Sequence, residues 1–583
     1  MKKIDRNIIR HYFDVEATVA REKWEALMAL TIKDRIRKRR AIEDVYFDKD
    51  FEEESESRYL LRKLFFQVNL SDFKEGEHLL LHRSDSIEGI ECTLIQFDGD
   101  NSAIIEVFPP NMPSDVDAYY GIPLILDKNC IDLRDNVYYN FLDDAPSDNS
   151  FWENLIINTG VSPVYENERA NAEELADMVK NFKLSLLPCQ KDAIIRSMSS
   201  TNYYLIQGPP GTGKSFVLGL VILEELLYFR HKVAIIGPNH MAVNNALETV
   251  LRLMPAFGRM LKIGQSFNAP KGKIVSEENV YEISNIPYLN VDGANSLDPP
   301  ILYGLTPHSL YTRRARDLEF DVLIIDEAGQ MTIPLALMGM VKAKKVIFAG
   351  DHKQLPPIIP ETIEGDLSVS VFESLMRDDN CTMLDTSFRM CGPICDFVSD
   401  LFYDGKLKPM KTGCSDKLIC DSPLYSFDNP VVFHEVDDFG EQTSDKEADY
   451  IVGTIIGFLD RGVEPQDIAI LSPFRAQAAF IRRRISKIES IPKGKRELIV
   501  SDTVDKLQGQ EREIIFYSFT AGALDYVMEM ADFLVKPNRL NVAFSRAKSK
   551  LIITGNFAQL RYLDNESYPH IPLLLEYAEK YAL

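Results

Sequence analysis

The stretch Gly208-Pro-Pro-Gly-Thr-Gly-Lys214-Ser215 decides how the rest of the chain is interpreted. A short apolar run before it, Tyr203–Gln207, predicts a buried strand, and the apolar run after it, Phe216–Phe229, predicts a helix. A glycine-rich turn between a strand and a helix lets backbone N–H groups wrap phosphate oxygens at the positive end of the helix. The predicted phosphate-binding residues are Gly208, Pro209, Pro210, Gly211, Thr212, Gly213, Lys214 and Ser215. Lys214 is expected on the β- and γ-phosphates, and the Ser215 hydroxyl on Mg²⁺.

Two adjacent acids end another apolar run, Asp321-Val-Leu-Ile-Ile-Asp326-Glu327. Asp326 is expected to hold the hydration shell of Mg²⁺, and Glu327 to orient and deprotonate an attacking water. A kinase acting on small molecules has no need of the second acid. The pair therefore favours hydrolysis of a nucleotide such as ATP.

A third polar turn, Gly350-Asp351-His352-Lys353-Gln354, follows the predicted strand Val346–Ala349. Such a loop lies at the carboxyl edge of a parallel sheet, where it faces a bound nucleotide. The Gln354 amide both donates and accepts hydrogen bonds, so it is a candidate sensor of the γ-phosphate or of the water. An ordinary polar turn is the alternative interpretation.

Apolar strands alternate with helices from about residue 181 onward, which predicts parallel sheets covered on both faces. Eleven strands suit two α/β domains better than one. The predicted strands are Tyr203–Gln207, Val233–Gly237, Ile301–Leu305, Val322–Ile325, Val346–Ala349, Met383–Asp385, Val431–His434, Ile468–Leu471, Leu498–Ser501, Ile514–Phe519 and Leu551–Thr554.

The N-terminal part has a different pattern. Residues 1–58 are expected to form a helical stalk with a basic cluster between Lys33 and Arg40, for which a solvated helix face is the simplest interpretation. Short apolar runs separated by turn signals predict a small antiparallel β-barrel over 59–142. Residues 143–180 are expected to be polar and helical. The two α/β domains are placed at 143–375 and 376–583.

Overall composition limits the partners and the compartment. The chain has 583 residues and a formal net charge of −23, which argues against coating nucleic acid by bulk positive charge but allows a local basic channel. We find no long apolar run and no secretory signal, so we expect no membrane segment and a cytoplasmic protein, with the nucleus left open. Eight cysteines favour a reducing compartment, and core packing is favoured over zinc ligation for Cys391, Cys395, Cys414 and Cys420.

An ordered series of short motifs between about 185 and 560 resembles the superfamily-1 helicases. The resemblance is to the 5′→3′ branch, typified by the nonsense-mediated-decay and immunoglobulin-mu-binding helicases. The segments that carry it, besides those above, are Leu187-Pro-Cys-Gln190, Pro238-Asn239-His-Met-Ala-Val-Asn244, Leu305-Thr306-Pro307, Ser387-Phe388-Arg389-Met390, Ser472-Pro473-Phe474, Thr503-Val504-Asp505-Lys-Leu-Gln508-Gly509-Gln-Glu511 and Leu540-Asn541-Val-Ala-Phe-Ser545-Arg546.

The resemblance implies roles for further residues. Gln190 would read the adenine, Phe388 would stack on it, and Glu511 would bind the ribose. Arg389 and Arg546, both in the second α/β domain, would reach the γ-phosphate. The residues implied to contact nucleic acid are Pro238, Asn239, Thr306, Pro473 and Thr503.

The fold expected from these observations is α/β, with two RecA-like parallel-sheet domains, an N-terminal helical stalk and a small β-barrel. The expected function is an ATP- and Mg²⁺-dependent helicase or translocase on single-stranded DNA or RNA, moving 5′→3′ by analogy with the family. One alternative is an ATP-driven clamp or remodeller that does not unwind duplex, which has the same sequence features. The other is a nucleotide-regulated binding or signalling module, against which the intact Glu327, Gln354, Arg389 and Arg546 argue.

Overall fold

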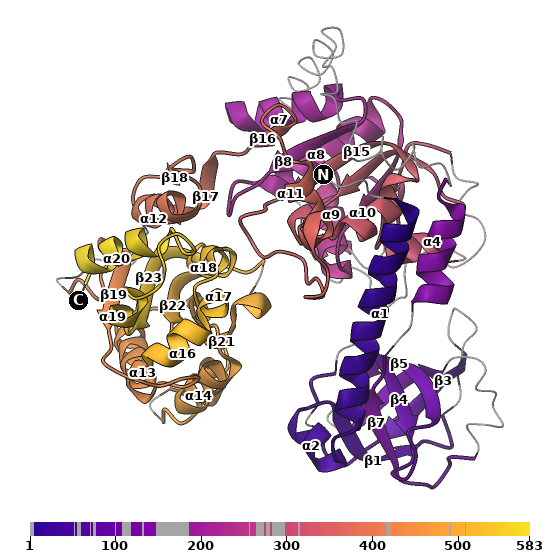
Figure 1. The fold of residues 1–583 in the computed structure, drawn as a ribbon, viewed down its shortest axis with the longest axis horizontal. Helices are drawn as coiled ribbons and strands as arrows, with labels where there is room; N and C mark the ends of the chain where they lie inside the picture. Colours follow the sequence, from indigo (N-terminus) through magenta and orange to yellow (C-terminus); the bar gives the residue numbers. More distant parts are fainter. Residues whose placement is uncertain are drawn as a thin grey trace.

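The structure is a computed structural model, and it consists of three bodies, two of which are joined by a long helix (Figure 1). It describes residues 5–582 except 52, 55–59, 70, 74–76, 99–100, 108–117, 131–132, 147–185, 256, 264–272, 276–279, 283–297, 313–314, 415–419, 421, 490 and 508. The helices expected between 143 and 180 therefore lie largely outside the described residues, as does Gln508. None of the described helices is long and apolar enough to cross a membrane.

A seven-stranded parallel sheet forms the first α/β domain, in the order β10-β13-β9-β14-β15-β8-β16. Successive side chains of a strand pack into hydrophobic cores on opposite faces of the sheet. Leu205 lies in one core and Ile206 in the other, so the sheet is covered on both faces. The strands are β8 Tyr203–Gln207, β9 Lys232–Ile236, β10 Met260–Lys262, β13 Ile301–Leu305, β14 Phe320–Ile325, β15 Ala343–Gly350 and β16 Cys381–Met383. The helices of this domain include α7 Pro188–Ser199, α8 Lys214–Leu227, α9 His240–Leu253, α10 Ile333–Met340 and α11 Val371–Leu375.

A five-stranded parallel sheet forms the second α/β domain, in the order β19-β23-β22-β20-β21. A two-stranded sheet precedes it, made of β17 Thr386–Cys391 and β18 Lys408–Lys411. The strands of the larger sheet are β19 Val431–Glu435, β20 Ile468–Ser472, β21 Val500–Thr503, β22 Arg512–Ser518 and β23 Ala547–Gly555. The helices include α12 Gly392–Phe402, α13 Asp445–Asp460, α14 Arg475–Ser486, α16 Leu524–Glu529, α18 Pro537–Phe544 and α20 Ile571–Lys580.

An antiparallel barrel forms the third body. Its strands follow the order β1-β7-β4-β5-β6-β3, and the pairing of β1 with β3 closes the sheet. The strands are β1 Ala41–Phe47, β3 Leu60–Phe65, β4 His78–His82, β5 Gly89–Phe97, β6 Ser102–Val107 and β7 Leu124–Lys128, with β2 Glu53–Glu54 beside β3. The two parallel sheets, the N-terminal helix and this barrel confirm the predicted fold class.

Helix α1, Arg6–Met28, joins the barrel to the first α/β domain (Figure 1). Near its start Phe13 stacks on Tyr138 with ring centroids 3.9 Å apart, and both belong to a core of the first domain. Near its end the Trp24 indole N–H donates to the Lys128 carbonyl of the barrel at 3.0 Å. The segment after β7, ending in α4 Tyr139–Asp144, returns to the same core. Both chain connections thus fasten the barrel to the first domain.

Three expectations need correction. Residues 1–58 are not all helical, because β1 and β2 lie inside them; the apolar side chains of β1, among them Val45 and Phe47, supply the barrel core. The boundary at 375/376 is too early, because β16 pairs with β8 in the first sheet. The basic cluster is not wholly solvated, because Arg35 is buried and pairs with the buried Asp127 at 2.8 Å.

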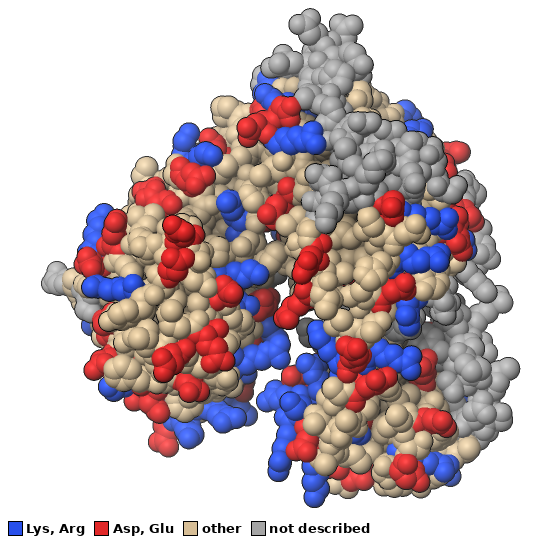
Figure 2. All heavy atoms as spheres, in the orientation of Figure 1, with Lys and Arg blue, Asp and Glu red and all other residues tan. Residues whose placement is uncertain are grey.

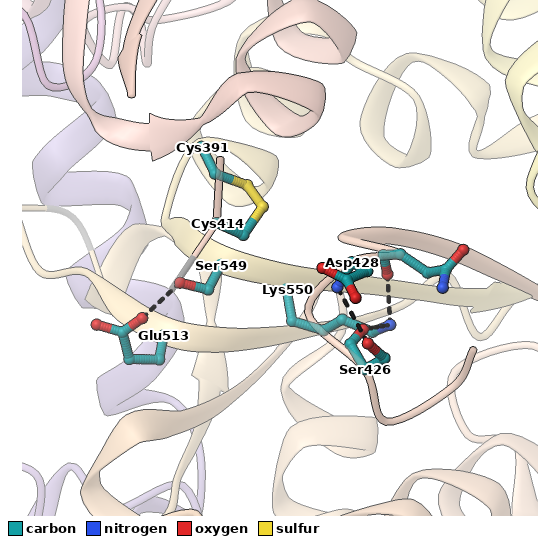
Figure 3. The surroundings of a disulfide bond; sticks show 8 residues. Cys391, Cys414, Ser426, Asp428, Glu513, Ser549 and Lys550 are labelled. Atoms are coloured by element: carbon teal, nitrogen blue, oxygen red, sulfur yellow. Dashed lines mark hydrogen bonds between the residues drawn. A yellow bond between two sulfur atoms is a disulfide. The ribbon is translucent and has the colours of Figure 1, made fainter. Parts of the chain in front are cut away.

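Cysteines 391 and 414 form a disulfide, with their Cα atoms 4.9 Å apart (Figure 3). The parallel pairing of β17 with β18 sets Cys391 opposite Lys411 and brings the two cysteines together. The sequence favours core packing over zinc ligation for both cysteines and does not predict the disulfide, which depends on the pairing of two separate strands. No group of three metal-binding side chains occurs within the described ranges.

Candidate active site

The glycine-rich turn lies between β8 and α8, as predicted. Gly211 and Gly213 have φ values of +75° and +81°, a backbone region that side chains disfavour. A Cβ on Gly211 would also lie 2.5 Å from the Cβ of Arg389. The second domain therefore approaches the turn at a point where only glycine leaves room. Gln190, on α7, supports the turn by donating a hydrogen bond to the Thr212 carbonyl at 3.3 Å.

Lys214 lies between the two acids that end β14. Its ammonium group donates to Asp326 and, at 2.9 Å, to Glu327. Gln330 holds the other Glu327 oxygen at 2.8 Å. Glu327 itself has a φ of +55°, an uncommon backbone conformation for a non-glycine residue and one that clusters at functional sites.

Protonation in this cluster follows from burial and charge. Burial opposes the charge on Lys214, but the two carboxylates outweigh it and raise the lysine pKa. Burial raises the pKa of Asp326, and the Glu327 charge adds to the effect. For Glu327 burial is outweighed by Lys214 and Gln330, so its pKa falls. Glu327 is thus the carboxylate of the pair held ionised, as a general base requires.

Strand β17 carries second-domain residues onto the turn. The Ser387 hydroxyl donates to the Pro210 carbonyl at 2.8 Å, and the Phe388 amide donates to the Gly211 carbonyl at 2.8 Å. The Phe388 ring is partly exposed at the edge of the resulting cavity. These backbone and hydroxyl contacts fix Phe388 and Arg389 against the phosphate-binding turn.

Both predicted arginines lie at the domain interface. Arg389 donates to Glu511 at 2.6 Å and to the Ser545 carbonyl at 3.1 Å. Arg546 is buried and donates to the Val542 carbonyl at 3.0 Å. Burial and the neighbouring Arg389 lower the pKa of Arg546 to about 9. Because Arg546 donates to a carbonyl and lies near another arginine, its charge is poorly neutralised, and binding of an anion beside it is favourable.

One cavity of about 710 Å³ collects the predicted chemistry. It is lined from the first domain by the glycine-rich turn, Asp326, Glu327 and Gln354, and from the second by Phe388, Arg389, Glu511 and Arg546. All six predicted catalytic residues thus face a single space, and the predicted ribose and adenine contacts Glu511 and Phe388 lie on its wall. Gln190 contacts the turn without lining the cavity.

Gln354 belongs to a second polar cluster at the back of the cavity. Its side-chain amide donates to Asp351 at 2.9 Å. Asp351 is buried and also accepts from Gln207, the last residue of β8, at 3.2 Å. The predicted sensor is therefore held in place by an acid for which the sequence pattern indicated no role.

The residues expected to contact nucleic acid all lie at or just after the carboxyl ends of strands. Pro238 and Asn239 come after β9, Thr306 after β13, and Pro473 after β20, while Thr503 ends β21. Asn239 is exposed and caps α9, but it also lines the cavity. The side chains of Thr306, Pro473 and Thr503 are buried. Their assignment to nucleic acid stays a prediction.

Sequence reasoning missed two contributors. Lys548 pairs with Glu511 at 2.9 Å, opposite Arg389, and helps to keep the Glu511 pKa low although burial opposes this. Tyr403 contacts Asp351 from the second domain at 2.6 Å. Neither lies in a segment with a local signal, and neither lines the cavity. Lys548 meets Glu511 through packing within the second domain, and Tyr403 meets Asp351 through the packing of the two domains.

The donor set suits ATP and Mg²⁺. The Ser215 hydroxyl and the Asp326 carboxylate line the same cavity and are hard oxygen ligands of the kind that Mg²⁺ prefers. Lys214, Arg389 and Arg546 supply positive charge around the place of the phosphates. Ser215 and Asp326 would hold the divalent ion, which when bound would neutralise negative charge that develops in transfer.

Comparison with known proteins gives matches over most of the chain. Two AAA-domain family models match residues 306–361 and 367–558. The "DNA polymerase alpha-associated DNA helicase A" of Schizosaccharomyces pombe is 28% identical over 468 residues, covering 70% of this chain and 69% of that protein. The "DNA replication ATP-dependent helicase/nuclease DNA2" of Xenopus laevis is 28% identical over 426 residues, covering 67% of this chain but only 39% of that protein.

A solved structure, an Arterivirus nonstructural protein 10 (helicase) with DNA, aligns with a TM-score of 0.38 at 15% identity, covering 84% of this chain and 79% of that one. The likeness to helicases rests instead on the motif order, the AAA-domain matches and the sequence relatives, together with a cavity that gathers the motif residues from two parallel-sheet domains. By these matches the chain is similar to ATP-dependent helicases, as the motif series predicts.

Proposed function

We propose that the protein is a helicase that hydrolyses ATP·Mg²⁺ between its two α/β domains and moves 5′→3′ on single-stranded DNA. The observation that carries this proposal is the shared cavity, in which Lys214 and Glu327 of the first domain face Arg389 and Arg546 of the second. DNA is favoured over RNA by the sequence relatives, whose printed names are those of DNA helicases.

In the proposed reaction the phosphates lie on the glycine-rich turn. Lys214 then exchanges one carboxylate partner for phosphate oxygens. Glu327 orients the attacking water and accepts its proton, while Gln354 contacts the water or the γ-phosphate. Arg389 and Arg546 stabilise the charge that develops on the γ-phosphate.

Because the arginines and the glycine-rich turn belong to different domains, hydrolysis requires the domains to be closed. Binding and release of the nucleotide therefore bias the domains between closed and open arrangements. A strand lying across the carboxyl ends of both sheets is advanced by that alternation.

The surface charge fits a narrow strand path better than a broad basic face. Acidic and basic side chains are interspersed over the visible face, while Lys and Arg gather along the edges of the barrel and the second domain that face each other (Figure 2). Binding by a limited set of cations predicts affinity that falls with salt and depends on the nucleotide state.

The decisive experiment compares ATP hydrolysis with matched single-stranded DNA and RNA, and then unwinding of duplexes with 5′ or 3′ tails. We expect stimulation by DNA and unwinding from the 5′ tail, with Lys214→Ala as the inactive control. Strong hydrolysis without unwinding from either tail would replace the helicase with a clamp or remodeller. Hydrolysis no greater than that of the control would favour a nucleotide-regulated binding module.

A further inference from the structure

The loop that carries Gln354 is held by the second domain as well as by the first. The Tyr403 hydroxyl donates to Asp351 Oδ2 at 2.6 Å and accepts from Asn541 Nδ2 at 2.7 Å. Asn541 Nδ2 also donates to the Lys353 carbonyl at 2.7 Å. Asn538, one turn earlier on α18, donates to the His352 carbonyl at 2.8 Å. Residues 351–354 of the first domain are therefore bound by Tyr403, just after α12, and by two side chains of α18.

The same loop touches the groups that meet the nucleotide. The Gly350 carbonyl accepts from the Gly208 amide, the first residue of the glycine-rich turn, at 2.9 Å. A Cβ on Gly329, in the turn after Glu327, would lie 2.6 Å from the Asp351 carbonyl oxygen. With backbones this close, a shift of Asp351 is transmitted to both the phosphate-binding turn and the acid pair.

Tyr403 is also connected to Arg389 through a single helix. It follows the last residue of α12, and α12 begins directly after β17, which carries Arg389. The Tyr403 side chain is buried, and burial together with the Asp351 charge raises its pKa, so the hydroxyl keeps its proton as a donor. It is an uncharged, short and well-packed contact between the two domains.

We propose that Tyr403 is a positioning residue that couples the Asp351–Gln354 loop to the second domain, so that events at the γ-phosphate move the domain that carries Arg389 and Arg546. It does not touch the nucleotide cavity, and it acts through Asp351. The proposal rests on the proposed function, because coupling has meaning only where a strand responds to the movement.

The test uses the full chain with Tyr403→Phe, which removes one oxygen atom and keeps the buried ring. Tyr311→Phe is the matched control, because Tyr311 is also buried and donates one hydrogen bond, to the Met338 carbonyl at 3.1 Å, away from the interface. Hydrolysis of ATP is measured with and without a saturating single-stranded DNA, and thermal unfolding is followed for each variant.

For Tyr403→Phe we expect hydrolysis without DNA to stay within about threefold of the unmodified protein, while the DNA-stimulated kcat falls about tenfold or more. The DNA concentration giving half-maximal stimulation should be unchanged, and Tyr311→Phe should keep full stimulation. Asn538→Ala, which loses contacts to the same loop from α18, should lower stimulation in the same direction. If Tyr403→Phe does not fold, the DNA stimulation of Asn538→Ala tests the coupling instead.

Equal stimulation of Tyr403→Phe and the unmodified protein would overturn the coupling role. So would a parallel fall in both rates together with a lower melting temperature, which is the signature of a structural contact alone. If no strand stimulates the unmodified protein, the proposed function itself fails and the coupling role with it, and that result is seen before any variant is measured.

Discussion

The two parallel sheets share one architecture and differ in the residues at the carboxyl ends of their strands. In the first sheet β8 leads into a glycine-rich turn and β14 ends at two acids paired with Lys214. In the second sheet β20 leads to Pro473 and β21 ends at Thr503, while the second-domain groups that line the cavity include the arginines 389 and 546. In the proposed reaction one domain holds the nucleotide and its water, and the other supplies the arginines that respond to them.

The two domains also differ in how they bury charge. In the first domain Lys214 is paired with the carboxyl groups of Asp326 and Glu327. Arg546 instead donates to backbone carbonyls and lies near another arginine, which lowers its pKa. The second domain thus presents a guanidinium without a carboxylate partner to the interface, and in the proposed reaction the γ-phosphate becomes that partner.

The largest expected effect comes from removing a charge that the second domain supplies. Arg546→Ala should lower kcat for ATP hydrolysis by roughly 10³-fold or more, because it removes charge stabilisation in the transition state. Steady-state hydrolysis at saturating DNA measures it, with nucleotide binding followed separately. A kcat within about tenfold of the unmodified protein would mean that the first domain suffices for catalysis.

The next effect tests the first domain. Glu327→Gln should retain ATP binding and lose turnover by roughly 10²- to 10⁴-fold, since the amide cannot accept a proton from water. The Gln side chain can still accept a hydrogen bond from Lys214, so the cavity should keep its shape. Binding of a fluorescent ATP analogue alongside single-turnover hydrolysis separates the two steps. Unchanged turnover would remove Glu327 as the base.

A smaller effect concerns recognition rather than chemistry. Phe388→Ala should raise KM for ATP by about fivefold with a lesser change in kcat, because a stacked aromatic contributes about 0.5–1.5 kcal/mol beyond its buried area. Comparing ATP with a triphosphate that lacks a base sharpens the result. The variant should bind the base-free triphosphate as well as the unmodified protein does, and equal losses for both ligands would contradict stacking.

The last prediction concerns the stability of the second domain rather than activity, and it rests on one buried acid. Glu447, on α13, accepts from Ser518 at 2.6 Å, from Thr554 at 2.8 Å and from the Thr520 amide at 2.9 Å, and burial raises its pKa to about 7. A carboxyl group with a raised pKa stabilises the fold at low pH and loses that contribution as pH rises through about 7.

We expect this contribution to fall by about 3 kcal/mol between about pH 4.5 and about pH 8. Urea unfolding across this range should therefore show the unmodified protein losing stability relative to Glu447→Gln as the pH rises. Parallel pH curves for the two proteins would show that Glu447 does not titrate in this way.

Much of the architecture could be predicted because its strands are apolar on both faces. Runs such as Tyr203–Gln207 and Ile301–Leu305 match β8 and β13 residue for residue. The strands that were missed are short or mixed: β10 has three residues and β17 carries Ser387 and Arg389. Hydrophobic pattern alone does not identify strands that are half polar or very short.

The cavity could be predicted to the extent that its residues lie in local motifs. Lys214, Asp326 and Glu327 each come after a strand signal, so their meeting at one sheet edge was foreseeable. The contacts between Arg389 and Glu511 and between Tyr403 and Asp351 join residues 122 and 52 positions apart. They depend on long-range packing, which no short stretch encodes.

Helix α1 gives the barrel a lever arm. From Phe13, packed in the first-domain core, the helix runs about 22 Å to its end at Met28 beside the barrel, at about 1.5 Å per residue. By simple trigonometry a tilt of about 9° at Phe13 carries that end through about 3.5 Å, close to the spacing of nucleotides along a strand. A small repacking around Phe13 is therefore enough to shift the barrel by one nucleotide.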